Sequence, residues 1–113
     1  MRRMLWMIGF LLLPAASLYA QGNAENGKKL FVKNGCYQCH GYEAQGTNAG
    51  ARLAPKPMAL TALIAYVRKP APGGMPIYSP KVMSDAELTD IWAFLKSIPD
   101  TPAVSTIPIL SGK

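Results

Sequence analysis

The sequence predicts a small all-α domain. Apolar residues recur at helical spacing in three segments, which cover residues 21–35, 60–67 and 84–97. Helix-capping residues flank these segments, and loops rich in glycine and proline separate them. A chain of 113 residues forms one such domain at most.

The first helix is expected to end at Gly35, since glycine often follows the last helical turn. Asn23 suits the N-cap position at its start. Gly27, Leu30 and Phe31 stand at i, i+3 and i+4 and so share one face. A glycine inside a helix costs about 1 kcal/mol relative to alanine. Gly27 therefore indicates either a frayed helix end or another helix that crosses closely there.

The second helix is expected to be short. Apolar residues recur at i, i+3, i+4 and i+7 from Leu60 to Val67. Thr61 is the expected N-cap, Arg68 falls in the last turn, and Pro70 enforces the end. Residues 69–80 are rich in proline and glycine and cannot continue as a helix.

The third helix has the clearest start signal. Ser84 and Glu87 form a capping box, and Met83 is placed to pack on Leu88 as a hydrophobic staple. Pro99 ends this helix. Six apolar residues are expected to form its buried stripe: Leu88, Ile91, Trp92, Phe94, Leu95 and Ile98.

The first twenty residues have the layout of a secretory signal. Arg2 and Arg3 precede an apolar run from Met4 to Leu13, and Ala20 is a small residue at the expected cleavage point. The run is too short for the ~20 residues that span a bilayer. An uncleaved membrane anchor is the alternative. The chain is thus divided into a signal peptide (1–20), a domain (21–99) and an extended C-terminal tail (100–113).

The only two cysteines and the only histidine stand together in Cys36-Tyr37-Gln38-Cys39-His40. A Cys-x-x-Cys-His run is the attachment signature of c-type haem. Two thiols at this spacing can form thioethers with one porphyrin, and the next residue can bring its imidazole under the iron. The sequence therefore predicts one covalent haem c, attached through Cys36 and Cys39, with His40 as the proximal iron ligand.

Three other uses of these residues are open. A structural zinc site needs about four ligands, whereas the chain offers three Cys and His residues in all. A disulfide would suit an exported chain with two cysteines. A thioredoxin-like redox pair would need a βαβ setting, and no such pattern surrounds Cys36.

Three helices, the haem motif after the first, and Met75-Pro76 before the last resemble the class I cytochrome c family. The resemblance covers nearly all of residues 23–99. It implies an all-α cytochrome c fold, with about three core helices around one haem. It further implies that the first and last helices cross, with Gly27 packed against Trp92.

The resemblance also implies the sixth iron ligand. Met75, within Gly-Gly-Met-Pro-Ile-Tyr, matches the distal methionine of the family. Met58 and Met83 are the competitors, and both are expected to pack in the core instead.

One departure concerns the histidine. The family often has Gly-Pro-x-Leu after the ligating His, and this proline's carbonyl accepts a hydrogen bond from the ring. Here the matching stretch is Gly50-Ala51-Arg52-Leu53. The Ala51 carbonyl is available for the same bond, on a less rigid backbone.

An iron held between His and Met has no open position, which favours single-electron transfer over catalysis. We predict a periplasmic electron carrier, or the electron-accepting subunit of a dehydrogenase, rather than an enzyme. The rival prediction is a haem enzyme or gas sensor with a labile sixth ligand and weak peroxidase-like activity. A third is a docking module whose tail anchors it to a larger enzyme.

The chain is basic, with a formal net charge of +6 at pH 7. It lacks a basic patch interleaved with aromatic residues, so a nucleic-acid partner is not expected. We expect instead a periplasmic dehydrogenase, oxidase or reductase with an acidic docking face. No membrane span is expected after signal cleavage. The candidate steering residues are Lys28, Lys29, Lys56, Lys69 and Lys81.

Overall fold

The computed structural model describes residues 21–112, so the predicted signal segment lies outside the described residues. Four α-helices follow one another, α1 (Ala24–Lys33), α2 (Cys36–His40), α3 (Leu60–Arg68) and α4 (Asp85–Ser97), and then a 3-10 turn, η2 (Val104–Thr106). Residues 21–112 contain no β-strand, only an isolated bridge between Thr47 and Gly50. The all-α prediction is confirmed, and α2 is an additional helix that the apolar spacing did not indicate.

The ends of α1 are set by local capping. The Asn23 side chain accepts a hydrogen bond from the Asn26 N–H at 2.9 Å, as expected of an N-cap. The helix begins at Ala24, so the residues before Asn23 are not part of it. Asn34 is the C-cap, and Gly35 follows with φ +77°, in the left-handed region that glycine tolerates. Gly35 thus ends the helix as predicted.

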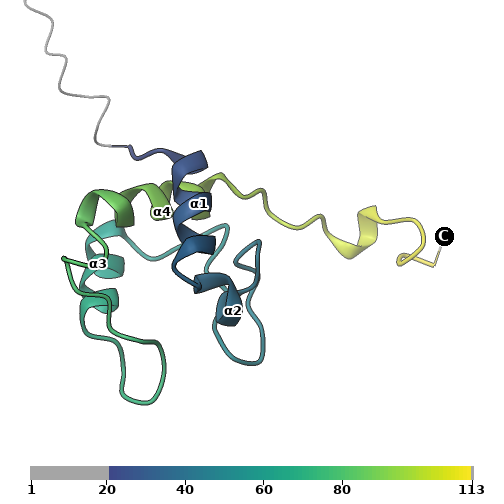
Figure 1. The fold of residues 1–113 in the computed structure, drawn as a ribbon. Coiled ribbons are helices and arrows are strands. Elements are labelled where there is room, and N and C mark those ends of the chain that lie inside the picture. Colours follow the sequence, from purple (N-terminus) through teal and green to yellow (C-terminus); the bar gives the residue numbers. More distant parts are fainter. Residues whose placement is uncertain (1–20, 113) are drawn as a thin grey trace, which may run out of the picture.

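α1 and α4 cross closely, as Figure 1 shows. A Cβ atom on Gly27 would collide with the backbone carbonyl of Asp90 in α4. Gly27 is therefore the contact point of two helices and not a frayed end. The predicted neighbour was wrong, because Gly27 meets the backbone of Asp90 and Ile91 rather than Trp92. The Asn26 side chain strengthens the crossing by donating to the Asp90 carboxylate at 2.7 Å.

The start of α4 has the predicted capping box. The Ser84 hydroxyl accepts from the Glu87 N–H at 3.2 Å, and the Glu87 carboxylate accepts from the Ser84 N–H at 2.7 Å. Met83 and Leu88 are both buried in one cluster, as a staple requires. Trp92 was expected in the buried stripe but is only partly buried.

α3 packs against α4 and starts differently from the prediction. Its N-cap is Ala59, which makes no side-chain hydrogen bond, and Thr61 lies inside the helix. Arg68 is its last residue, directly before Lys69 and Pro70. Apolar burial, rather than a polar cap, therefore stabilises this short helix, and its most buried residues are Leu63 and Val67.

The core lies between α1, α3 and α4. Phe31 and Phe94 pack with ring centroids 5.5 Å apart. Met58 was expected in the core, but its side chain is 47% exposed. This residue contributes its backbone instead, since the Met58 carbonyl accepts a hydrogen bond from Trp92 Nε1 at 3.0 Å. The buried apolar residues are Leu30, Phe31, Ala44, Ala54, Leu63, Val67, Met83, Leu88, Ile91, Phe94 and Leu95.

The tail leaves the helical body after Pro99 and extends away from it (Figure 1). Val104, Ile109 and Leu110 expose most of their surface there. Within residues 21–112, no helix is long and apolar enough to span a membrane.

Candidate functional site

The Cys-x-x-Cys-His run forms α2, a helix of five residues. Glycines with positive φ flank it, and Gly41, at φ +80°, donates its N–H to the Tyr37 carbonyl at 2.8 Å. Cys36 is partly buried against the core, whereas Cys39 is exposed. His40 is half-buried at the end of the same turn. The fold thus concentrates both thiols and the imidazole on one short segment.

The His40 ring is oriented by the backbone of the following loop. Its Nδ1 lies 2.7 Å from the Ala51 carbonyl oxygen. Because a carbonyl only accepts hydrogen bonds, Nδ1 carries a proton, and the lone pair of the neutral ring is then on Nε2. The bond expected from Ala51 in place of proline is therefore present. An imidazole in this tautomer is suited to bind a metal through Nε2.

The loop after α2 folds back over the helix. The Gly46 N–H donates to the His40 carbonyl at 2.8 Å, and the Thr47 hydroxyl donates to the Cys39 carbonyl. Gly50 is so close that a Cβ atom there would lie 2.7 Å from the Cys39 carbonyl oxygen. We call α2 and residues 41–54 the proximal wall. It is held by several backbone contacts that leave little room for movement.

Across from the proximal wall lie α3 and the loop of residues 69–80 (Figure 1), which together we call the distal wall. The Tyr78 N–H donates to the Val67 carbonyl at 3.2 Å and closes the base of this loop. Met75 is partly buried and packs against the core. The loop tip at Gly73 and Gly74 is exposed, and nothing lies within 4 Å of a Cβ at Gly73.

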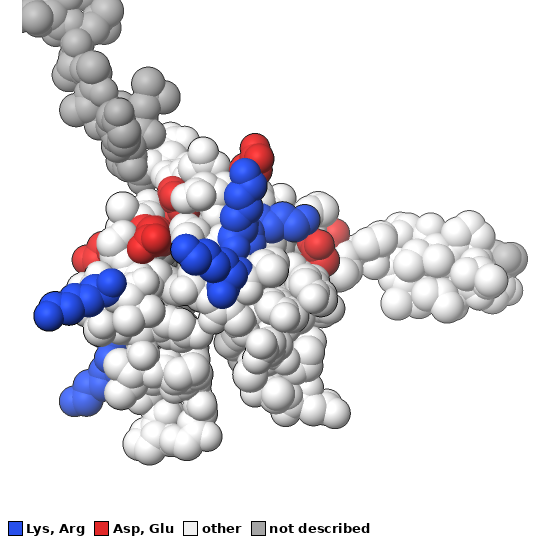
Figure 2. Space-filling model, in the orientation of Figure 1, with Lys and Arg blue, Asp and Glu red and all other residues white. Residues whose placement is uncertain are grey.

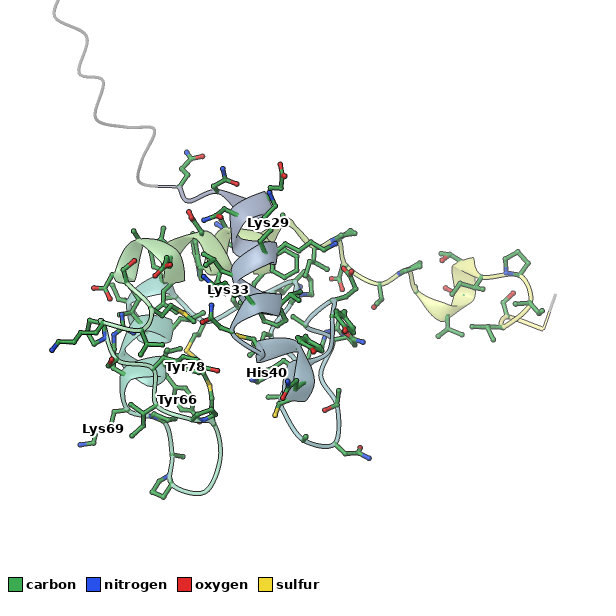
Figure 3. The ribbon with its side chains drawn as sticks, in the orientation of Figure 1. Lys29, Lys33, His40, Tyr66, Lys69 and Tyr78 are labelled. Atoms are coloured by element: carbon green, nitrogen blue, oxygen red, sulfur yellow. The ribbon has the colours of Figure 1, made fainter. Side chains whose placement is uncertain are left out.

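A notch separates the two walls in Figure 2, and the surfaces that border it in this view are uncharged. Figure 3 shows His40 on one side and Tyr66 and Tyr78 on the other. Tyr66 exposes 43% of its surface although it is a large aromatic residue of a core helix. An uncharged notch with two thiols and a free imidazole nitrogen on one wall fits a flat, apolar, iron-containing group. The residues present therefore fit a haem.

The three methionines considered as iron ligands, Met58, Met75 and Met83, differ in burial. Met83 is 1% exposed and lies inside the core, as predicted. Met58 lies at the surface, contrary to the prediction. Only Met75 is both partly buried and carried by the distal loop.

The rival uses of the cysteines find no support. Both thiols are free, without a disulfide between them. Burial raises the pKa of the Cys36 thiol to about 11, so this thiol is neutral at pH 7. Across residues 21–112, no three His, Cys, Asp or Glu side chains gather as a metal site.

The five candidate lysines differ in their partners. Three pair with exposed carboxylates, Lys28 with Glu43 (3.9 Å), Lys29 with Glu25 (3.2 Å) and Lys56 with Asp100 (3.9 Å). Within the described part of the chain, Lys69 and Lys81 form no ion pair. Figure 2 shows basic side chains over α1 and beside α3, and Figure 3 places Lys69 at the outer edge of the distal wall.

Sequence reasoning missed the two residues that fix the distal loop. The Tyr78 hydroxyl donates to the Asn34 carbonyl at 2.8 Å, and Arg68 donates to the Tyr78 carbonyl at 2.8 Å. Burial, with the neighbouring cysteine thiols, raises the pKa of Tyr78, so its hydroxyl keeps the proton that it donates. Asn34 and Tyr78 are 44 positions apart, and no local pattern indicates such a pair.

A family model described as Cytochrome C oxidase, cbb3-type, subunit III matches residues 22–95. No curated protein and no solved structure matches the chain. The matched residues make up more than half of the sequence and include both cysteines, His40 and Met75. The helices, the geometry of the proximal wall and this match all indicate the same family. The chain therefore belongs to this cytochrome c domain family, a mono-haem c-type family that holds covalent haem c and transfers electrons.

Proposed function

We propose that the protein is a periplasmic one-electron carrier whose haem iron is held between His40 and Met75, with Cys36 and Cys39 as the thioether residues. The observation that carries this proposal is the 2.7 Å contact between His40 Nδ1 and the Ala51 carbonyl. It leaves Nε2 free on the same turn as both thiols. The signal-like residues 1–20 support export, which this family usually requires.

The bound haem supplies one-electron exchange at its iron. The residues of the chain would bind the haem and orient the side chains that hold it. The Ala51 carbonyl holds the His40 ring, and the contacts of the proximal wall keep α2 in place. A methionine sulfur as the second protein ligand would raise the reduction potential relative to a second histidine. With His40 and Met75 both bound, the iron would have no position left for a substrate.

The proposed partner is a redox protein with an acidic docking face. Lys69 and Lys81 support this, since neither is neutralised by an ion pair within residues 21–112. The family description names an oxidase subunit, so a larger complex is one setting for the chain. A free carrier and the electron-accepting subunit of a dehydrogenase are the others.

A second candidate function is weak peroxidase-like activity or gas binding. The open tip of the distal loop favours it, because Gly73 (φ +78°) has no neighbour within 4 Å of a Cβ and Gly74 meets only one atom, at 3.6 Å. A methionine next to such a tip can leave the iron more easily than one on a helix.

An optical spectrum of the isolated haem protein distinguishes the two functions. Ferric haem with a bound methionine sulfur has a weak charge-transfer band at the red edge of the visible spectrum. We expect this band in the wild type and in Met58→Ala, and its loss in Met75→Ala. A wild-type protein that is high-spin and binds carbon monoxide directly would instead favour the second candidate.

A further inference from the structure

The base of the distal loop is fixed at one residue, Tyr78. Its N–H donates to the Val67 carbonyl at 3.2 Å, and its carbonyl accepts from Arg68 Nη1 at 2.8 Å. Arg68 also donates to the Asp85 carboxylate at 2.6 Å, at the start of α4, and the Arg68 side chain is only 18% exposed. The backbone of Tyr78 is thereby tied to both α3 and α4.

The side chain of Tyr78 connects the distal wall with the segment that precedes the haem motif. Its hydroxyl donates to the Asn34 carbonyl at 2.8 Å. Asn34 is itself held by two hydrogen bonds to the Leu30 carbonyl, one from its N–H and one from its side chain. It is separated from Cys36 by Gly35 alone. The acceptor of the Tyr78 bond is thus a fixed point beside the site of haem attachment.

Tyr78 is also the fixed point nearest to Met75 along the chain. Only two residues, Pro76 and Ile77, separate Tyr78 from Met75, and Pro76 stiffens this short connection. On the other side of Met75 the two glycines of the tip meet almost nothing. The position of the Met75 sulfur therefore depends on Tyr78 far more than on the tip.

We propose that Tyr78 is a positioning residue, a latch whose hydrogen bond to Asn34 holds the distal loop closed and keeps Met75 at the iron. This inference rests on the proposed His40 and Met75 ligation. Without the hydroxyl, the loop loses one hydrogen bond that exists only in the closed state. The open state, in which an external ligand can replace Met75, then becomes more populated.

The test is titration of the ferric haem protein with imidazole, followed by its optical spectrum. One neutral hydrogen bond corresponds to about three- to tenfold in an equilibrium, so Tyr78→Phe should bind imidazole about three- to tenfold more tightly than wild type. Ser97→Ala is the matched control, since it also removes one hydroxyl hydrogen bond, the 2.7 Å bond to the Phe94 carbonyl, but from the last turn of α4 and not from the distal loop. It should change the affinity by less than about twofold.

Two further variants keep the outcome unambiguous. Arg68→Lys loosens the loop base without touching the Tyr78 hydroxyl, and it should also raise the imidazole affinity. It takes the place of Tyr78→Phe as the test where that variant folds poorly. Equal imidazole affinities for Tyr78→Phe, Ser97→Ala and wild type, with the methionine band still lost in Met75→Ala, would overturn the latch alone. An unchanged band in Met75→Ala would overturn the ligand assignment itself.

Discussion

The two walls of the haem site are built by different means. On the proximal wall, the carbonyls of Cys39 and His40 accept hydrogen bonds from the following loop, the His40 ring is bonded to Ala51, and Gly50 packs directly on the helix. On the distal wall, Lys69 and Ser79 bond only to residues close to them along the chain, and within residues 21–112 Tyr78 alone carries the hydrogen bonds that join the loop to more distant segments.

This difference matches the two tasks. A covalently attached haem and its histidine ligand need a fixed position, because the angle of the imidazole ring sets how its nitrogen binds the metal. A methionine sulfur on a loop that is fixed at one residue can be displaced from the iron, or held more tightly there, by changing one hydrogen bond. The proximal wall should therefore tolerate substitution poorly, whereas the distal loop should tolerate it well except at Met75 and Tyr78.

The largest effect is expected at the cysteines. Replacing both Cys36 and Cys39 by alanine removes both thioether bonds, so haem should separate completely from the denatured polypeptide. The measurement is haem staining of the protein after denaturing electrophoresis. Met58→Ala, a surface change, should retain the stain. Retention of haem by the double variant would contradict attachment through these two residues.

The difference in packing between the two walls can be tested at one glycine of each wall. Gly50→Ala would place a Cβ 2.7 Å from the Cys39 carbonyl, and it should lower the free energy of unfolding by about 1–3 kcal/mol. Gly74→Ala meets nothing closer than 3.6 Å, and it should leave the stability unchanged or raise it by about 0.4–1 kcal/mol, since alanine restricts the unfolded chain. Denaturant unfolding of the two haem proteins measures both values. Equal costs at the two positions would contradict the difference between the walls.

The smallest effect is expected from surface charge. Lys69→Gln with Lys81→Gln should slow electron transfer to ferricyanide by about two- to fivefold at low ionic strength, and the difference should fade as salt screens the charges. Lys29→Gln is the matched control, since Lys29 already pairs with Glu25 at 3.2 Å. Stopped-flow kinetics at several salt concentrations measure the rates. A slowing that is the same at all salt concentrations would rule out electrostatic steering.

Features that depend on neighbours along the chain were predictable. Asn23 as N-cap and the capping box of Ser84 and Glu87 are interactions within three or four residues, so the sequence specifies them directly. Thr61 was a wrong prediction of the same kind. The chain enters α3 at Ala59 without a side-chain cap, because burial of Leu63 and Val67 suffices to hold the helix.

Features that depend on two distant segments were predicted only in outline. The cost of glycine in a helix indicated either a frayed end or a close helix crossing at Gly27, and the resemblance to class I cytochromes c implied the crossing. The neighbour of Gly27 is the Asp90 backbone and not Trp92. Met58 was expected in the core because it lies just before a core helix, yet its carbonyl accepts a hydrogen bond from Trp92 and its side chain lies at the surface. Hydrophobicity alone does not tell which side of a segment faces inward.

The sequence by itself indicated covalent haem c, because Cys36, Cys39 and His40 stand within five residues and their spacing can be recognised without the fold. It also determined α1, α3 and α4 in outline and the polar N-caps of α1 and α4, which rest on contacts within one turn. Only the tertiary structure decided how the site is held. The carbonyl of Ala51 reaches His40, and the hydroxyl of Tyr78 reaches Asn34, through bonds whose geometry exists only after the helices have packed.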